Sequence, residues 1–228
     1  MQTEILYRPS YSLARVRLDP GEQIRVEAGS MVSMSEGMTI ETKMQGGLLK
    51  SLARSVLGGE SFFVNLYCAP AQGGEITVAP ALPGDLTVLE LAGDALMVQS
   101  GAFVASATTI DTNAAWGGAK TFFASEGLIM LRAEGSGPLI LGSYGAIHEL
   151  NLEAGQTYTV DTGHLVAFSA NIGFRVRRVG GLRSTLLSGE GLVVDLTGPG
   201  RVLMQTRSAD AFLSWLGPKL PKERNNRS

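Results

Sequence analysis

Chemically versatile residues are scarce in this sequence, which has one cysteine, Cys68, and two histidines, His148 and His164, among 228 residues. A single cysteine excludes an internal disulfide framework, and so few histidines leave little material for metal or nucleophilic chemistry. No apolar run approaches the roughly 20 residues of a membrane-spanning helix, which argues against an integral membrane protein. The N-terminal residues also lack the basic and apolar stretches of a secretory signal, so we expect a cytoplasmic protein.

An excess of charge of one sign is lacking too, because 19 basic and 21 acidic residues leave a net charge of −2. Such a chain has no overall field that would hold a polyanion. It also shows no repeated interleaving of basic and aromatic residues. Nucleic acid is therefore not an expected partner.

Glycine, by contrast, is abundant at 29 positions and recurs in a fixed frame. The frame runs glycine, four residues, valine, two residues, glycine, two residues, valine. It begins at Gly21, Gly93 and Gly155 and ends at Val32, Val104 and Val166. A double glycine follows 25, 24 and 25 residues after each first glycine (46−21, 117−93, 180−155). Matching spacing in three copies indicates an internal repeat of a short module.

Apolar and polar residues alternate within and around these frames, which predicts half-buried strands. Examples are residues 23–26, 157–160 and 174–179. Glycine segments at 73–74, 135–137 and 198–200 are predicted to be hairpin turns that open the last strand of each copy. We therefore predict an all-β fold of three tandem sandwich modules, at residues 1–80, 81–145 and 146–208.

Two segments depart from the β pattern. Residues 48–57 place apolar side chains at helical spacing with Lys50 and Arg54 opposite, which predicts a short helical insertion in the first module. Ser208 suits the N-cap of a helix that runs to Leu216 and is stopped by Gly217-Pro218. Residues 209–228 are therefore expected to form a short C-terminal helix, whose apolar face covers a sheet edge or contacts another subunit, and a basic tail.

The run Val160-Asp161-Thr162-Gly163-His164-Leu165-Val166-Ala167-Phe168, with Gly189-Glu190-Gly191-Leu192 and Gln205-Thr206-Arg207, resembles the Altered-Inheritance-of-Mitochondria-twenty-four family. The resemblance covers about residues 1 to 208. It implies a fold like that of the tryptophan RNA-binding attenuation protein, a short double-stranded β-helix-like sandwich present three times with pseudo-threefold symmetry in the chain. It also implies homotrimers whose nine modules close a pseudo-ninefold ring. Tandem β units have open edges, and ring closure removes them.

The resemblance implies a mitochondrial biogenesis family without an established bacterial activity. Likeness of fold to the attenuation protein does not carry that protein's function. No carboxylate pair, nucleophile with its base, or metal cluster stands out in the sequence, so we expect neither an enzyme nor a cofactor. The weak candidates for a metal site are His148, Glu149, Asp161 and His164, which lack the H-x-H pattern of cupin-type sites.

Each double glycine is followed by a basic residue and a hydroxyl. These pairs are Lys50-Ser51, Lys120-Thr121 and Arg183-Ser184. On a closed ring they would lie along one rim and could contact anionic head groups or an acidic partner, although solvated cations beside turns would give the same pattern. Acidic residues recur at Glu60, Glu126 and Glu190, where we expect them to accept backbone N–H bonds in glycine turns.

The sequence thus predicts a non-enzymatic, ring-forming scaffold or adaptor that supports membrane-associated or multiprotein assemblies. Its expected partners are further copies of itself, forming a homotrimer, together with other proteins or an anionic membrane surface. The alternative is a ring that binds a small metabolite in the clefts between modules.

Overall fold

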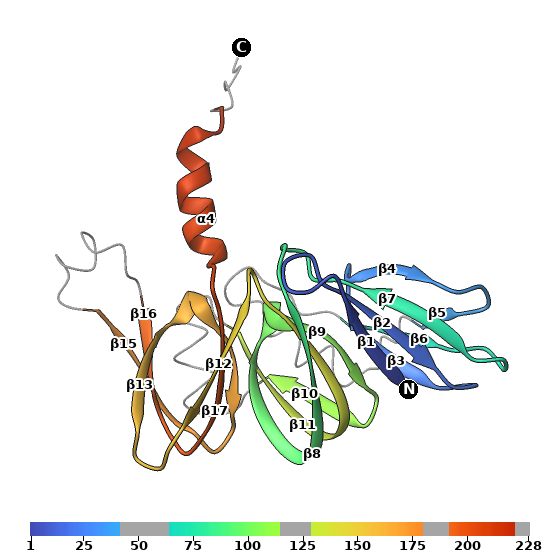
Figure 1. The fold of residues 1–228 in the computed structure, drawn as a ribbon, viewed down its shortest axis with the longest axis horizontal. Coiled ribbons are helices and arrows are strands. Elements are labelled where there is room, and N and C mark those ends of the chain that lie inside the picture. The colour runs from blue at the N-terminus through green and yellow to red at the C-terminus, as the bar shows by residue number, and fades with distance from the viewer. Residues whose placement is uncertain (42–63, 115–128, 180–191, 222–228) are drawn as a thin grey trace.

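Strands make up nearly all of the regular structure in the computed structural model of the chain (Figure 1), which describes residues 1–41, 64–114, 129–179 and 192–221. The strands are β1 (Gln2–Leu6), β2 (Leu13–Leu18), β3 (Gln23–Glu27), β4 (Met31–Met34), β5 (Thr39–Glu41), β6 (Val64–Cys68), β7 (Gly74–Val78), β8 (Leu86–Gln99), β9 (Phe103–Ala107), β10 (Ile110–Ala114), β11 (Met130–Gly142), β12 (Ile147–Leu152), β13 (Thr157–Asp161), β14 (Leu165–Ser169), β15 (Gly173–Arg178), β16 (Leu192–Thr197) and β17 (Gly200–Gln205). The described helical elements are α4 (Ala209–Leu216) and the 3₁₀ turns η2 (Ser100–Ala102), η3 (Thr162–His164) and η4 (Gly217–Lys219). The predicted all-β class is confirmed.

The alternation of side chains explains why these segments form strands. In β3, Ile24 and Val26 are fully buried, whereas Arg25 between them is half-buried and donates to the carbonyl of Ile110. Successive strand residues point to opposite faces, so such a segment can bury one face and solvate the other. The strands predicted at residues 23–26, 157–160 and 174–179 are therefore confirmed as β3, β13 and β15.

The same four antiparallel pairings occur in each third of the chain. In residues 1–80, β2 pairs with β7, β7 with β4, β3 with β6 and β6 with β5. In residues 81–145, β8 and β11 pair with each other along both of their halves, and β9 and β10 also pair with β11. In residues 146–208, β12 pairs with β17, β17 with β14, β13 with β16 and β16 with β15. Each third therefore has two layers of three strand segments, to which β1 adds a further strand in the first third.

Neighbouring thirds join through main-chain hydrogen bonds between strands. The strand β9 pairs with β3, with Ala105 opposite Val26. The strand β14 pairs with β8 in the same way, with Ala167 opposite Val98. These two junctions connect the thirds into one ten-stranded sheet that continues through the molecule.

The glycine segments at 73–74, 135–137 and 198–200 are corners rather than hairpin turns, so that prediction is wrong. At 73–74 and 198–200 the strands on either side pair with different partners, whereas 135–137 lies within β11, whose pairing with β8 shifts register there. The chain crosses at each segment from one layer of its third to the other. Gly135 shows the physical reason. It has φ +140°, and a Cβ at this position would lie 2.2 Å from the carbonyl oxygen of Thr109. Only glycine permits this bend and close approach.

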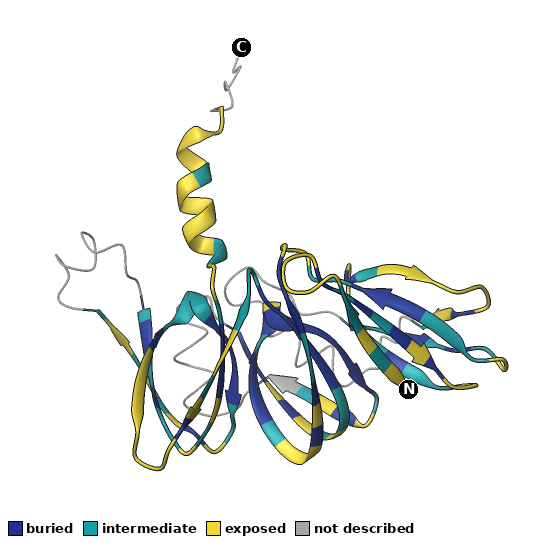
Figure 2. Cartoon of the chain, in the orientation of Figure 1, coloured by how far each residue is buried: buried dark blue, intermediate teal, exposed yellow. Residues whose placement is uncertain are grey.

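The hydrophobic cores are shared between neighbouring thirds. The core of the first third includes Val104 and Ile140 from the second, and the core of the second includes Val166 and Leu203 from the third. The core of the third contains Met97 from the second third but has no following third in the chain. Buried residues consequently run through the whole row of strands (Figure 2). The thirds are therefore packed as one body and do not form separate domains.

The C-terminal helix begins as predicted, because the Ser208 hydroxyl accepts a hydrogen bond from the Ala211 amide at 3.4 Å. The α-helix also ends at Leu216, as predicted. Gly217 nevertheless keeps helical angles, φ −49° and ψ −48°, and the chain continues into the 3₁₀ turn η4. Proline is tolerated in a first turn because its fixed φ suits a helix, so Pro218 does not end the helical path.

The helix α4 stands away from the strands (Figure 1). Among the described helices, none combines the length and the apolar character that crossing a membrane requires. The helical insertion predicted at residues 48–57 lies outside the described residues.

Candidate assembly edges and adjoining sites

Several of the described strands pair along one side only, and among them β4 and β13 differ from their counterparts in both other thirds of the chain. The strand β4 pairs with β7, and β13 pairs with β16. The counterparts of β4 are β9 and β14, and both of these strands are paired on both sides. The counterparts of β13 are β3 and β8, which are also paired on both sides. Figure 1 places β4 and β13 toward opposite ends of the row of strands. An unpaired strand edge offers free N–H and C=O groups to another strand.

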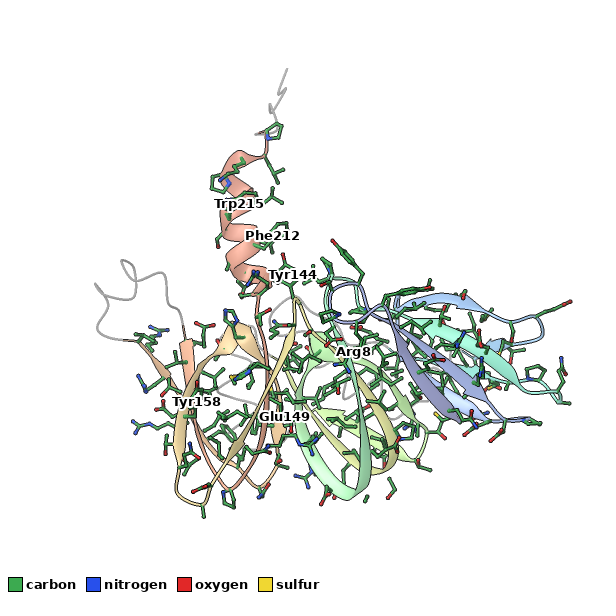
Figure 3. The ribbon with its side chains drawn as sticks, viewed as in Figure 1. Arg8, Tyr144, Glu149, Tyr158, Phe212 and Trp215 are labelled. Carbon is green, nitrogen blue, oxygen red and sulfur yellow. The ribbon has the colours of Figure 1, made fainter. Side chains whose placement is uncertain are left out.

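Both edges expose apolar side chains among polar ones. The last valine of the glycine frame is 0% exposed at Val104 and Val166 but 58% exposed at Val32. Met34, on the same strand as Val32, is 38% exposed, and Tyr158 on β13 is 43% exposed (Figure 3). The two ends of the row of strands thus expose apolar side chains whose counterparts are buried at the internal junctions.

A groove of about 690 Å³ lies between the second and third thirds, where β8 bends at Gly93. Two arginines line it. Arg132 Nε lies 3.0 Å from Glu134 Oε2, and Arg201 Nε lies 3.4 Å from Glu149 Oε1. Each guanidinium has more donors than its single carboxylate contact uses, so the groove has hydrogen-bonding capacity for a polar ligand.

A buried carboxylate connects three linkers between strands, which join β1 to β2, β7 to β8 and β11 to β12. Asp85 is 4% exposed and receives two hydrogen bonds from Arg8, at 2.9 and 2.8 Å, and one from Ser12 at 2.9 Å. Its amide donates to Gly145 in the next linker. Burial alone raises the pKa of Asp85, but the bonds from Arg8, Ser12 and the Leu86 amide outweigh burial and hold the pKa below its usual value. This ionised group therefore ties the N-terminal loop to the rest of the fold.

The four weak metal candidates are spread over separate interactions. His148 is exposed on β12, and Glu149 pairs with Arg201. Asp161 accepts a hydrogen bond from the Gly163 amide at 2.8 Å, and Nδ1 of His164 donates to the Gln205 carbonyl at 2.7 Å. Within the described ranges, no three His, Cys, Asp or Glu side chains are grouped to hold a metal ion.

The rim and turn residues proposed from the sequence lie outside the described residues. They are Lys50, Ser51, Lys120, Thr121, Arg183 and Ser184 for the rim, and Glu60, Glu126 and Glu190 for the turns. Their roles stay predictions.

Sequence reasoning missed the buried Asp85 and the exposed edges. The only local signal for Asp85 was its position directly after Pro83-Gly84. Its partner Arg8 is 77 positions away in the sequence, so no local pattern connects the two residues. Nothing local distinguishes Val32 from Val104, because both occupy the same place in the frame.

Comparison with known proteins agrees with this architecture. The model of the family described as Mitochondrial biogenesis AIM24 matches residues 3–207. An uncharacterised protein of Streptococcus pyogenes is 29% identical over 227 residues, covering 94% of this chain and 89% of its own length. An X-ray crystal structure of a Streptococcus pyogenes protein superposes with a TM-score of 0.81 at 28% identity, covering 96% of this chain and 99% of the other. Because the family match spans nearly all of its length, this chain belongs to the Mitochondrial biogenesis AIM24 family.

Proposed function

We propose that this protein is a non-enzymatic scaffold that assembles into a ring, in which β13 of one copy pairs with β4 of the next. The three thirds of the chain are, in this proposal, three copies of one attenuation-protein-like sandwich. The recurrence of four pairings in each third supports that view. A scaffold needs no reactive centre, only a rigid body with repeated surfaces for other molecules.

The observation that carries the proposal is the exposure of Val32. Its counterparts Val104 and Val166 are buried in the core of the preceding third. The third core has no following strand within the chain, and Val32 has no preceding core. Placing Val32 of a second copy against β13 of the first would bury Val32 and cover the third core at the same time. Burial of such apolar surface is the main driving force of association.

The internal junctions also supply a register. Met97 faces Phe168 at one junction, and Arg25 faces Ser106 at the other. The same spacing within the frame places Thr159 of one copy opposite Met34 of the next. Repetition of one head-to-tail contact produces a closed ring when the rotation between copies closes. Three copies are the number that the family resemblance implies.

A disulfide test addresses this register directly. Thr159→Cys and Met34→Cys, combined in a chain whose Cys68 is replaced by alanine, should form disulfides between chains on mild oxidation. The products should be ladders that end at three chains on a denaturing gel. The matched control is Tyr158→Cys with Met34→Cys, which moves one thiol to the other face of the sheet and should not cross-link. A chain that sediments as a monomer at micromolar concentration, or equal cross-linking of both pairs, would refute the assembly.

The second candidate function is metabolite binding in the groove beside Arg132 and Arg201. The groove lies at a junction between thirds, and a ring would provide further junctions. A metabolite class that raises the melting temperature by several degrees would favour this function, because a ligand that binds only the native state stabilises it. Arg201→Gln should abolish that shift. Absence of any shift across polar metabolites leaves the scaffold as the better proposal.

A further inference from the structure

The helix α4 exposes a large apolar surface to solvent. Leu213 is 60% exposed, Trp215 is 58% exposed and Phe212 is 38% exposed, and Leu220 beyond the helix is 56% exposed. No residue of α4 is buried. Figure 2 shows the helix exposed along most of its length as it leaves the strands. An exposed cluster of this kind is uncommon in a soluble protein and marks an interaction surface.

The apolar residues occupy one broad side of the helix. At 100° per residue, Phe212, Leu213, Trp215 and Leu216 share one side, whereas Asp210 and Ser214 lie on the other. The rings of Phe212 and Trp215 are stacked with centroids 6.1 Å apart, and Phe212 also meets Tyr144 edge-on at the base of the helix (Figure 3). The base of the helix is thus held by an aromatic contact, while more than half of the Leu213 and Trp215 surfaces remains exposed.

Charge indicates what this surface contacts. From Gly217 to the end, the sequence carries four basic residues, Lys219, Lys222, Arg224 and Arg227, against Glu223, a net charge of +3 (4−1). The whole chain carries −2, so residues 1–216 carry −5 (−2−3). Lys219 Nζ already lies 4.6 Å from the Trp215 ring centre. Aromatic and leucine side chains beside a basic segment suit the interface of an anionic bilayer, where the rings enter the head-group region and the cations meet lipid phosphates.

We propose that α4 and the basic segment after it bind anionic lipid surfaces. The acidic body would be repelled by the same surface, so the strands would face away from it. This inference deepens the proposed scaffold by naming its partner, and it rests on the ring only for avidity. One short helix binds weakly, whereas several helices on one ring would bind together with a much larger apparent affinity.

The test uses the full chain carrying Trp116→Phe, which leaves Trp215 as the fluorescent reporter. Vesicles of phosphatidylcholine with phosphatidylglycerol should shift its emission to shorter wavelength and co-sediment with the protein, and vesicles of phosphatidylcholine alone should do neither. Replacing Lys222, Arg224 and Arg227 with glutamine should weaken binding by about fivefold for each charge, and added salt should have a similar effect. In a sedimentation assay, Leu213→Ser with Trp215→Ser should weaken binding by at least about tenfold.

The matched control is Tyr11→Ser, which removes an aromatic side chain that is 76% exposed elsewhere and should bind like the unaltered protein. Equal binding to neutral vesicles, or no binding at low salt by protein that sediments as a ring, overturns the lipid inference and leaves the scaffold standing. If the Leu213 and Trp215 changes alter the mass of the assembly and not its binding to vesicles, the helix contacts a second copy of the chain and the lipid inference fails. A monomer that binds anionic vesicles supports the inference and refutes the ring.

Discussion

Replacing Val32 with serine should weaken self-association and leave the folding of the single chain nearly unchanged. The side chain is 58% exposed in one chain, so its removal costs the monomer little. Full burial of a valine contributes about 1.5 to 3 kcal/mol. With 58% of that surface left to cover, each junction should lose about 1 to 1.7 kcal/mol, or roughly 5- to 20-fold in association constant.

Val104→Ser is the matched comparison because Val104 holds the same place in the frame and is 0% exposed. This change removes buried methyl groups and leaves a hydroxyl in the core, so it should lower the free energy of unfolding by about 2 to 4 kcal/mol. The two variants are therefore expected to affect different equilibria although the substitution is chemically identical.

Sedimentation velocity over a dilution series measures the association, and urea unfolding at concentrations where the Val32 variant is monomeric measures the fold. The Val32 variant should dissociate at higher concentrations than the unaltered protein. The reasoning is wrong if this variant keeps the same mass at every dilution. It is equally wrong if the Val32 variant loses as much unfolding free energy as the Val104 variant.

Three further predictions concern the rest of the chain. Asp85→Ala should lower the free energy of unfolding by about 3 kcal/mol. Arg8→Ala should lower it by only about 1 kcal/mol, because the Arg8 side chain is 53% exposed. A double-mutant cycle measured by urea unfolding checks the coupling between the two residues. Because the pKa of Asp85 is lower in the folded than in the unfolded state, ionised Asp85 adds to the free energy of unfolding above the unfolded pKa of about 3.9. That stability is lost as the pH falls through the lower folded value. Asp85→Asn should therefore make unfolding less sensitive to acid in this pH window, without changing its pH dependence near neutral pH. Gly135→Ala should destabilise the fold by at least about 2 kcal/mol because its Cβ would meet the Thr109 carbonyl oxygen at 2.2 Å, and a melting temperature close to that of the unaltered protein would contradict the corner geometry.

The sequence predicted the local elements well, because strand periodicity and helix capping depend on neighbouring residues. The strands around each frame and the Ser208 cap follow directly from such patterns. Glycine segments were misassigned as hairpins because a corner and a hairpin both need glycine, and only the pairing partners distinguish them. The exposure of Val32 and the pairing of Arg8 with Asp85 depend on which segments meet across the fold, and no periodicity encodes that. The basic rim and the recurring glutamates lie outside the described residues, so the structure bears on neither.

The sharing of core residues between neighbouring thirds has a consequence for the way this protein loses its structure. Removal of the last third would strip Val166 and Leu203 from the core before it, and loss of the middle third would strip Ile140 from the first. Proteolytic fragments of about one third should therefore collapse rather than persist as stable pieces, and thermal melting of the intact chain should be a single cooperative transition. Damage at one end would then lead to clearance of the whole molecule instead of the release of a still-folded remnant.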